Sequence, residues 1–235
     1  MSRFHLSRVI VALDVKSFDE AEKILCHLSN RVEYVKIGMQ AFFGYGERII
    51  PSAKDKGYKV FLDLKLCDIP NTVSSAIKSL SKYRFDLLSV HISGGLEMLK
   101  SASRAIKENL SDAGIIGVTI LTSLNEEDIS SIGYEIPMER TVDKMVRLAC
   151  EAGITGVVCS AKEIERVRDV SKGGLKIITP GIRLDMDSTQ DQKRVETPKV
   201  AFSRGADYVV MGRSIIEGDI KSNLDRVEMH LSAEG

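Results

Sequence analysis

Short apolar runs alternate with longer amphipathic stretches along the whole chain, and no other feature of the sequence restricts the possible fold as strongly. Each run is mostly apolar, which is typical of parallel strands that are buried on both faces. Strands that alternate with helices form a parallel sheet. The predicted strands are Val9–Leu13, Tyr34–Ile37, Val60–Leu62, Leu87–Val90, Ile115–Leu121, Gly156–Cys159, Leu175–Ile178 and Tyr208–Met211.

The amphipathic stretches between these runs are predicted helices, and several carry terminal signals. Ser17 and Glu20 form a capping-box sequence, Gly57 is placed to end a helix, and Pro70 suits a first helical turn. The predicted helices run from Ser17 to about Leu28, over Glu47–Lys56, from Pro70 onward, and over Glu97–Asn109, Glu139–Glu151, Lys162–Val170, Lys199–Ser203 and Leu224–Leu231, with a short turn at Arg213–Ile216.

Eight such units within 235 residues predict an α/β fold, a single (β/α)₈ TIM barrel that spans residues 1–235 as one domain. The alternative is an open doubly wound sheet, which carries a glycine-rich phosphate-binding turn after its first strand. Here the first strand is followed by Asp14-Val15-Lys16, which contains no glycine. The closed barrel is therefore the favoured architecture.

Composition excludes several classes of function. Lys and Arg together number 33, as do Asp and Glu, and this balance argues against a broad nucleic-acid or membrane surface. No stretch approaches the roughly 18 apolar residues of a membrane span, and the first residues lack a signal-peptide apolar region. Cys26, Cys67, Cys150 and Cys159 show no CxxC spacing, so we interpret them as reduced thiols in a cytoplasmic protein.

Polar residues gather at the ends of the predicted strands, where barrel enzymes carry their active sites. Asp63 and Lys65 are two apart in an extended chain, so both side chains should point into the barrel mouth. Lys36 arrives from the neighbouring strand, and Asp14 follows the first strand. A lone Asp-x-Lys is more often a structural ion pair, but four converging charges favour a functional site.

The segment Asp63-x-Lys65-x-x-Asp68-Ile-Pro-Asn-Thr72, preceded by Phe61-Leu62, resembles the signature of the orotidine 5′-monophosphate decarboxylase family. The resemblance implies a TIM barrel that converts orotidine monophosphate to uridine monophosphate and carbon dioxide, the last step of UMP biosynthesis. Further matches follow in family order: Ala12-Leu13-Asp14, Val35–Gly38, Val90–Gly95, Leu121-Thr122-Ser123, Thr179–Arg183, Asp191–Arg194 and Gly212–Ile215.

The same resemblance assigns the catalytic residues. Lys36, Asp63, Lys65 and Asp68 form a charged tetrad around the scissile carboxylate, and Lys65 gives a proton to carbon 6 of the pyrimidine. Loss of carbon dioxide leaves a carbanion in the ring plane, which an ammonium group can stabilise and protonate. The family pattern also implies a homodimer with shared sites, in which Asp68 enters the neighbouring pocket. The alternative for Asp68 is a cap for the helix begun by Pro70.

The substrate-binding residues are carried over in the same way, and the resemblance implies neither a cofactor nor a metal. Asp14 and Lys36 bind ribose, Thr122 and Ser123 bind the pyrimidine, and Thr72 lies near the shared site. Thr122 and Ser123 could also cap a helix before the acidic turn at residues 126–128, and the two roles can coexist. The phosphate grip consists of Arg183, Gln192, Gly212 and Arg213, and Pro180 is a further substrate-binding residue.

Two further expectations concern residues near these groups. The segment Leu184–Gln192 is interpreted as a lid that closes over phosphate. His91 stands at a strand end, where a general acid is conceivable. Because the tetrad already supplies the proton, we expect a structural role for His91.

Two other functions remain open on the sequence. One is a magnesium-dependent sugar-phosphate decarboxylase or hexulose-phosphate aldolase, since those enzymes share Asp-x-Lys-x-x-Asp after the third strand. They place a metal-binding Glu on the second strand, where this chain has Lys36, and a cation there would oppose metal binding. The other is a catalytically silent nucleotide sensor, which would require a lost catalytic residue, and none is missing.

Overall fold

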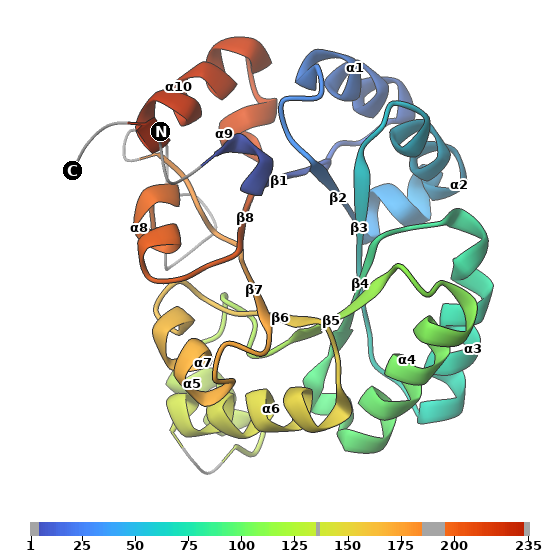
Figure 1. Cartoon of the computed structure of the whole chain (residues 1–235), viewed down its shortest axis with the longest axis vertical. Coiled ribbons are helices and arrows are strands. Elements are labelled where there is room, and N and C mark those ends of the chain that lie inside the picture. Colours follow the sequence, from blue (N-terminus) through green and yellow to red (C-terminus); the bar gives the residue numbers. More distant parts are fainter. Residues whose placement is uncertain (1–4, 135–136, 185–195, 233–235) are drawn as a thin grey trace.

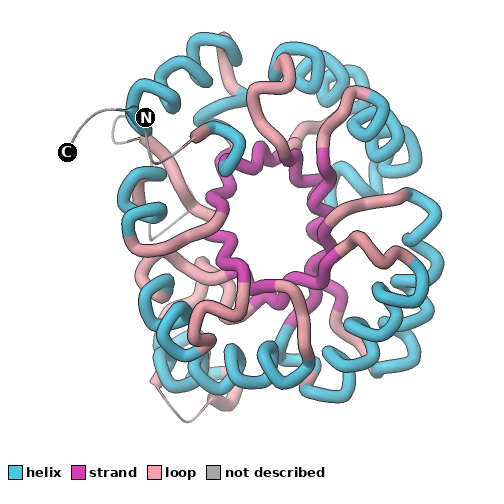
Figure 2. Tube along the Cα trace, viewed as in Figure 1, coloured by secondary structure: helices cyan, strands magenta, loops and turns pink. Residues whose placement is uncertain are grey.

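The computed structural model describes residues 5–134, 137–184 and 196–232, and within them the strands close into one parallel barrel. Figure 1 shows the strands as a central ring, and Figure 2 shows the helices as an outer ring joined to it by loops. Each strand pairs with its sequence neighbours, and β8 returns to β1. The strands are β1 Val9–Ala12, β2 Tyr34–Gly38, β3 Lys59–Leu66, β4 Leu87–His91, β5 Gly114–Val118, β6 Gly156–Val158, β7 Lys176–Thr179 and β8 Tyr208–Met211. The predicted TIM barrel is confirmed.

The helices lie outside the strand ring and cover it. No helix in the described ranges is long and apolar enough to cross a membrane. The helices are α1 Phe18–Leu28, α2 Met39–Asp55, α3 Pro70–Leu80, α4 Leu96–Asn109, α5 Glu126–Ser131, α6 Met138–Ala152, α7 Ile164–Val170, α8 Pro198–Ser203, α9 Arg213–Ile216 and α10 Ile220–Ser232, with short 3₁₀ turns at Leu6–Arg8, Ser81–Tyr83 and Ile92–Gly94.

Two apolar cores result from the alternation of side chains along each strand. The larger core lies between the strands and the helices and includes Leu25, Ile77 and Leu88. The smaller core fills the barrel interior, as in other (β/α)₈ proteins. Its buried members are Ile10, Ala12, Tyr34, Phe61, Leu87, Ile116, Ile178 and Val210. Polar residues that continue these inward-facing rows therefore project into the barrel mouth.

Two aspartates tie neighbouring strands together near the strand starts. The Asp86 carboxylate, just before β4, accepts a hydrogen bond of 2.7 Å from the backbone N–H of Val60 in β3. In the same way, the Asp207 carboxylate before β8 accepts one of 2.7 Å from the N–H of Ile177 in β7. Each aspartate also binds a basic side chain from a helix. Because catalytic residues of these barrels lie at the other end, we assign these ties to stability.

Two strand predictions need correction. β3 extends to Leu66 instead of ending at Leu62, so Asp63 and Lys65 lie within the strand. Asp63 interrupts the apolar run but still pairs with Gly38 of β2, and its side chain faces the barrel mouth. β5 ends at Val118 instead of Leu121, because the chain turns into the loop that precedes α5.

Three helix predictions also differ from the structure. α2 begins at Met39, not at Glu47, and has a kink at Tyr45 (φ −159°, ψ 25°). α10 begins at Ile220, before the predicted Leu224. Residues 126–131 form the short helix α5 in place of an acidic turn, and Asn125 caps it together with Asp128. The alternative cap role of Thr122 and Ser123 is therefore wrong.

Candidate active site

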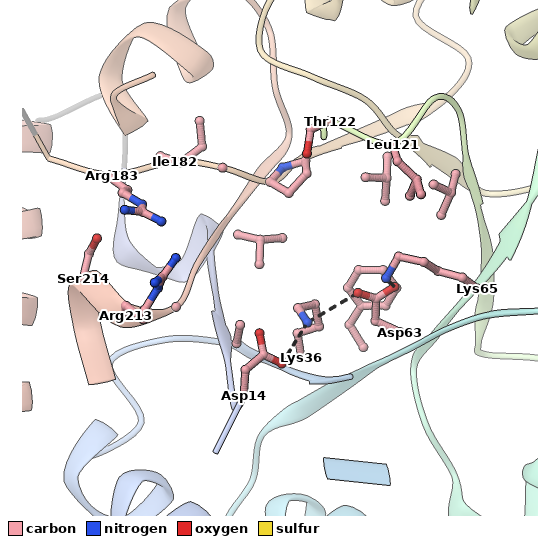
Figure 3. Close-up of a pocket in the computed structure, with 18 of the residues that line it drawn as sticks. Asp14, Lys36, Asp63, Lys65, Leu121, Thr122, Ile182, Arg183, Arg213 and Ser214 are labelled. Carbon is pink, nitrogen blue, oxygen red and sulfur yellow. Dashed lines mark hydrogen bonds and ion pairs between the residues drawn. The ribbon is translucent and has the colours of Figure 1, made fainter. Parts of the chain in front are cut away.

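A cavity of about 600 Å³ opens at the carboxyl ends of the strands, as expected for this fold. Its floor is the upper layer of the barrel interior, and its walls carry charged side chains from β2, β3 and the loops after β7 and β8 (Figure 3). A low-polarity floor beneath fixed charges strengthens electrostatic interactions inside the cavity. The floor consists of the apolar side chains of Ala12, Phe61, Val118, Val158 and Val210.

A row of alternating charges crosses one wall of the cavity. The Lys36 ammonium lies 3.4 Å from Asp14 Oδ1 and 3.4 Å from Asp63 Oδ2. The Lys65 ammonium lies 2.9 Å from Asp63 Oδ1. Figure 3 shows the order Asp14, Lys36, Asp63 and Lys65. The structure thus brings together four of the predicted site residues. The prediction that the side chains of Asp63 and Lys65 both point into the barrel mouth is confirmed.

Asp63 remains a carboxylate although the residue is only 8% exposed. Burial alone would raise the pKa of Asp63, but the charges of Lys36 and Lys65 and hydrogen bonds from Lys65 and Ser89 outweigh it, so the pKa is lowered. A buried charge is tolerated when it is paired and hydrogen-bonded. The two lysines therefore keep Asp63 negative, and Asp63 holds both ammonium groups in place.

The backbone of β3 is irregular where it carries Lys65. The register with β4 shifts between Leu62 and Leu66. Lys65 adopts φ 51°, in the left-handed region that residues other than glycine rarely occupy. Such conformations persist only where surrounding contacts impose them, and they cluster at functional sites.

Two arginines occupy the opposite side of the cavity from Lys65. Arg213 begins α9 after β8, and Arg183 follows β7; Figure 3 shows both guanidinium groups directed into the cavity. The backbone N–H of Arg183 donates to the Glu196 carbonyl at 3.1 Å, which ties this loop to the segment before α8. Guanidinium groups bind phosphate oxygens with paired hydrogen bonds, so this end suits a phosphate group.

The remaining predicted site residues divide into three groups. Thr122, Pro180 and Gly212 line the cavity with the residues above. Asp68, Thr72 and Ser123 are exposed and lie outside the wall that the described residues form. Gln192 and all of the predicted lid except Leu184 fall outside the described residues.

Asp68 does not cap α3 in the predicted way. The cap residue is Ile69, and the Asp68 carboxylate instead accepts a hydrogen bond of 2.7 Å from the Ile69 N–H. Asp68 and Ile69, the two residues before α3, are both exposed. The carboxylate is thus left at the surface of the chain, outside its own cavity.

His91 ends β4 and is half-buried beside the charged row. Burial, followed by the charge of Lys65, lowers the pKa of His91. A neutral imidazole is a poor proton donor compared with an ammonium group nearby. The structural role expected for His91 stays a prediction.

Sequence reasoning missed three polar residues of this site. Gln40, the second residue of α2, and Ser214, the second residue of α9, both line the cavity. Gln40 was hidden because α2 begins earlier than predicted, whereas Ser214 follows a predicted site residue directly. Ser89 is fully buried in β4 and contacts Asp63 and Lys65. A serine within an apolar run carries no sequence signal of such contacts.

Metal binding has no obvious place in the described part of the chain. In that part, no group of three or more His, Cys, Asp or Glu side chains is arranged to hold a metal ion. Asp14 and Asp63, the acidic residues among those described as lining the cavity, are both paired with Lys36.

Comparison with known proteins gives a consistent result. A sequence model of the orotidine 5′-phosphate decarboxylase / HUMPS family matches residues 7–223. The orotidine 5′-phosphate decarboxylase of Carboxydothermus hydrogenoformans is 43% identical over 213 residues, 89% of each chain. That of Fusobacterium nucleatum is 45% identical over 208 residues, 88% of each chain.

Solved structures show the same similarity. The crystal structure of orotidine 5′-phosphate decarboxylase from Lactobacillus acidophilus superposes with a TM-score of 0.84 at 32% identity. The match covers 97% of this chain and 100% of that one.

Proposed function

The chain belongs to the orotidine 5′-phosphate decarboxylase / HUMPS family, and we propose that it converts orotidine 5′-monophosphate to uridine 5′-monophosphate and carbon dioxide. This carboxy-lyase reaction completes the synthesis of UMP. The observation that carries the proposal is the contact of Lys36 and Lys65 with the single carboxylate of Asp63 at the cavity wall. We also propose that residues 1–235 act as one catalytic domain.

Lys65 supplies the proton in this proposal. The bond between carbon 6 and the carboxylate carbon breaks, and its electron pair stays on carbon 6 as carbon dioxide leaves. The Lys65 ammonium stabilises this charge and then gives it a proton, which solvent later restores. Asp63 and Lys36 fix the position of Lys65 through their contacts of 2.9 Å and 3.4 Å along the row. Positioning at the reacting atom is itself a large source of acceleration.

The nucleotide spans the cavity from the charged row to the arginines. Asp14 and Lys36 take ribose hydroxyls, Thr122 and Ser123 take the pyrimidine, and Thr72 stands near the shared site. The substrate phosphate lies against the arginines across the cavity from Lys65, which places the reacting ring near the charged row. The phosphate-binding set is Arg183, Gln192, Gly212 and Arg213, and Pro180 is a further substrate-binding residue.

Lys36 favours decarboxylation of the nucleotide over the metal-dependent sugar-phosphate reactions. It lies in β2 and pairs with both Asp14 and Asp63, the carboxylates that a metal would need. An ammonium between them repels a divalent cation. We therefore propose catalysis without metal or organic cofactor, and the named relatives in the comparisons are decarboxylases of the nucleotide.

The exposed Asp68 supports a shared site in a homodimer. Ile69, next in sequence, is 66% exposed, and Phe43 of α2 is 77% exposed. The exposed apolar side chain of Ile69, next to a carboxylate that lies outside its own cavity, suits contact with a second copy. We propose that Asp68 enters the partner's cavity as the fourth member of the tetrad. We further propose a cytoplasmic location, without nucleic-acid or membrane partners.

The experiment that tests this function follows the loss of orotidine monophosphate absorbance with purified protein, before and after prolonged chelation. We expect turnover that survives the chelator. No turnover of the nucleotide would contradict the assignment. Turnover that vanishes on chelation and returns with magnesium would move the chain to the metal-dependent reactions.

A further inference from the structure

Ser89 is a fully buried polar residue in the wall of the barrel interior. It lies in β4 between Leu87 and His91 and pairs in register with Ile116 of β5. The strand positions around it are apolar. A hydroxyl in such surroundings is unfavourable unless its hydrogen-bonding capacity is satisfied.

The Ser89 hydroxyl connects two residues of the charged row. It donates a hydrogen bond of 2.8 Å to Asp63 Oδ1 and accepts one of 2.8 Å from the backbone N–H of Lys65. A serine hydroxyl has one proton and two lone pairs, so both contacts can form together. Asp63 Oδ1 is also the atom that the Lys65 ammonium contacts at 2.9 Å.

The Lys65 N–H needs this partner because the strand ladder is broken there. The register between β3 and β4 shifts between Leu62 and Leu66, and Lys65 lies in that interval with φ 51°. In a regular strand pair, the N–H would bond to a backbone carbonyl. The hydroxyl takes that place and stabilises a backbone conformation that residues with a side chain disfavour.

We propose that Ser89 is a positioning residue for the decarboxylation, because its hydroxyl holds the Asp63 carboxylate and the Lys65 backbone as one unit. The direction of the Lys65 side chain depends on its backbone conformation, and its ammonium depends on Asp63 for its contact. A single buried hydroxyl therefore fixes both the Lys65 backbone and the Asp63 carboxylate. The inference rests on the proposed function, since the position of the proton donor matters only for that reaction.

Three substitutions of Ser89 test the role. Ser89→Ala removes the hydroxyl, Ser89→Cys keeps a side chain of similar shape with a weak donor and acceptor, and Ser89→Thr keeps the hydroxyl. The control is Thr119→Val, which removes another buried hydroxyl that bonds only to a strand carbonyl, that of Val158 at 2.9 Å. Thermal denaturation establishes that each variant is folded.

The expected result is a loss of kcat without a matching loss of substrate affinity. Ser89→Ala and Ser89→Cys should lower kcat by about 10- to 100-fold, because a misplacement of about 1 Å at a reacting group can reach the upper figure. KM should change by less than about threefold, since the phosphate-binding arginines are untouched. Ser89→Thr and Thr119→Val should stay within about threefold of the parent kcat.

The acid limb of the pH profile gives a second measurement. Asp63 is faced by Lys36 from β2, Lys65 from β3, and Ser89 and His91 from β4. The Ser89 hydrogen bond favours the charged carboxylate, so its removal raises the pKa of Asp63. Activity that needs this carboxylate should then be lost at a higher pH as the solution is acidified. A purely structural serine would not move this limb.

Three results would overturn the role of Ser89 while the parent enzyme still turns over the nucleotide. They are an unchanged kcat in Ser89→Ala, a loss confined to KM, or an equal loss in Thr119→Val. An inactive parent enzyme would instead contradict the proposed function. If the buried site cannot accommodate threonine, Ser89→Ala alone decides whether the hydroxyl matters, because it removes only the hydroxyl oxygen.

Discussion

Lys36 and Lys65 contact opposite oxygens of one carboxylate, at 3.4 Å from Oδ2 and 2.9 Å from Oδ1 of Asp63. The two ammonium groups come from neighbouring strands and would repel each other without the charge between them. Asp14 pairs with Lys36 on its other side, so the row of four carries two positive and two negative charges. This arrangement fixes the position of the Lys65 ammonium, which the proposed reaction needs.

Gly38 gives a way to disturb this row without touching a charged residue. A Cβ atom at Gly38 would lie 3.0 Å from Asp14 Oδ1 and 3.2 Å from Lys36 Nζ. Its φ of −84° suits alanine, so Gly38→Ala should displace the flexible ends of the ion pair and leave the backbone unchanged. We expect kcat/KM to fall at least about tenfold, with a free energy of unfolding within about 1 kcal/mol of the parent.

The matched control is Gly44→Ala in α2, where a Cβ would meet nothing within 4 Å. It should keep full activity, and stability should be equal or slightly higher, because alanine is favoured over glycine inside helices. Steady-state kinetics and denaturant unfolding measure both quantities. Full activity in Gly38→Ala would show that the Asp14–Lys36 contact has no part in the reaction.

Arg213→Ala should weaken turnover as well as binding. The phosphate is remote from the reacting carbon, and remote binding energy can orient the substrate at the reacting end. We expect kcat/KM to fall by about 10- to 100-fold, equivalent to a charge-assisted hydrogen bond of about 1.5–3 kcal/mol. The kcat at saturating substrate should fall too. Arg104→Ala, an exposed arginine of α4, is the control; an unchanged kcat in Arg213→Ala would leave Arg213 as a simple anchor.

A mixing experiment tests whether Asp68 serves the neighbouring cavity. Lys65→Ala and Asp68→Ala, each inactive alone, are unfolded and refolded together. If sites are shared, each heterodimer has one intact site, and random pairing should restore about a quarter of the parent activity. Recovery is followed by the absorbance assay, with subunit exchange verified by native mass spectrometry.

The control for this experiment mixes Lys65→Ala with Asp63→Ala. Both residues line the cavity of their own chain, so every site in the mixture keeps one defect. This mixture should remain inactive. If the Asp68→Ala mixture is equally inactive after complete exchange, Asp68 acts in its own barrel or not at all.

The barrel itself could be predicted because its determinants are local. Buried parallel strands need predominantly apolar runs, and such runs mark every strand of the closed sheet. Strand periodicity predicts the shared direction of Asp63 and Lys65, although the left-handed backbone of Lys65 is not that of a regular strand. Their charges also made the predicted end of β3 wrong. A strand predicted from its apolar residues ends at Leu62, four residues before the observed end at Leu66.

The remaining details depend on contacts between distant segments. The sequence did not predict the early start of α2, because Gly44 and Gly46 have a low helix propensity although both lie within the helix. The role of Ser89 depends on a register shift in β3, the neighbouring strand. No pattern within β4 reports that shift, so only the folded arrangement shows what the hydroxyl contacts.

The turnover of orotidine monophosphate by Lys65→Ala, compared with the parent enzyme, tests the central claim most directly. Lys172→Ala is the matched control, because Lys172 also has a left-handed backbone (φ 50°, against 51° for Lys65) but lies exposed in the loop before β7. We predict that Lys65→Ala stays folded and loses at least about 10,000-fold in kcat, the upper range for general acid catalysis, whereas Lys172→Ala keeps full activity. A folded Lys65→Ala variant within about tenfold of the parent kcat, a difference of only about 1.4 kcal/mol in barrier, would contradict the account.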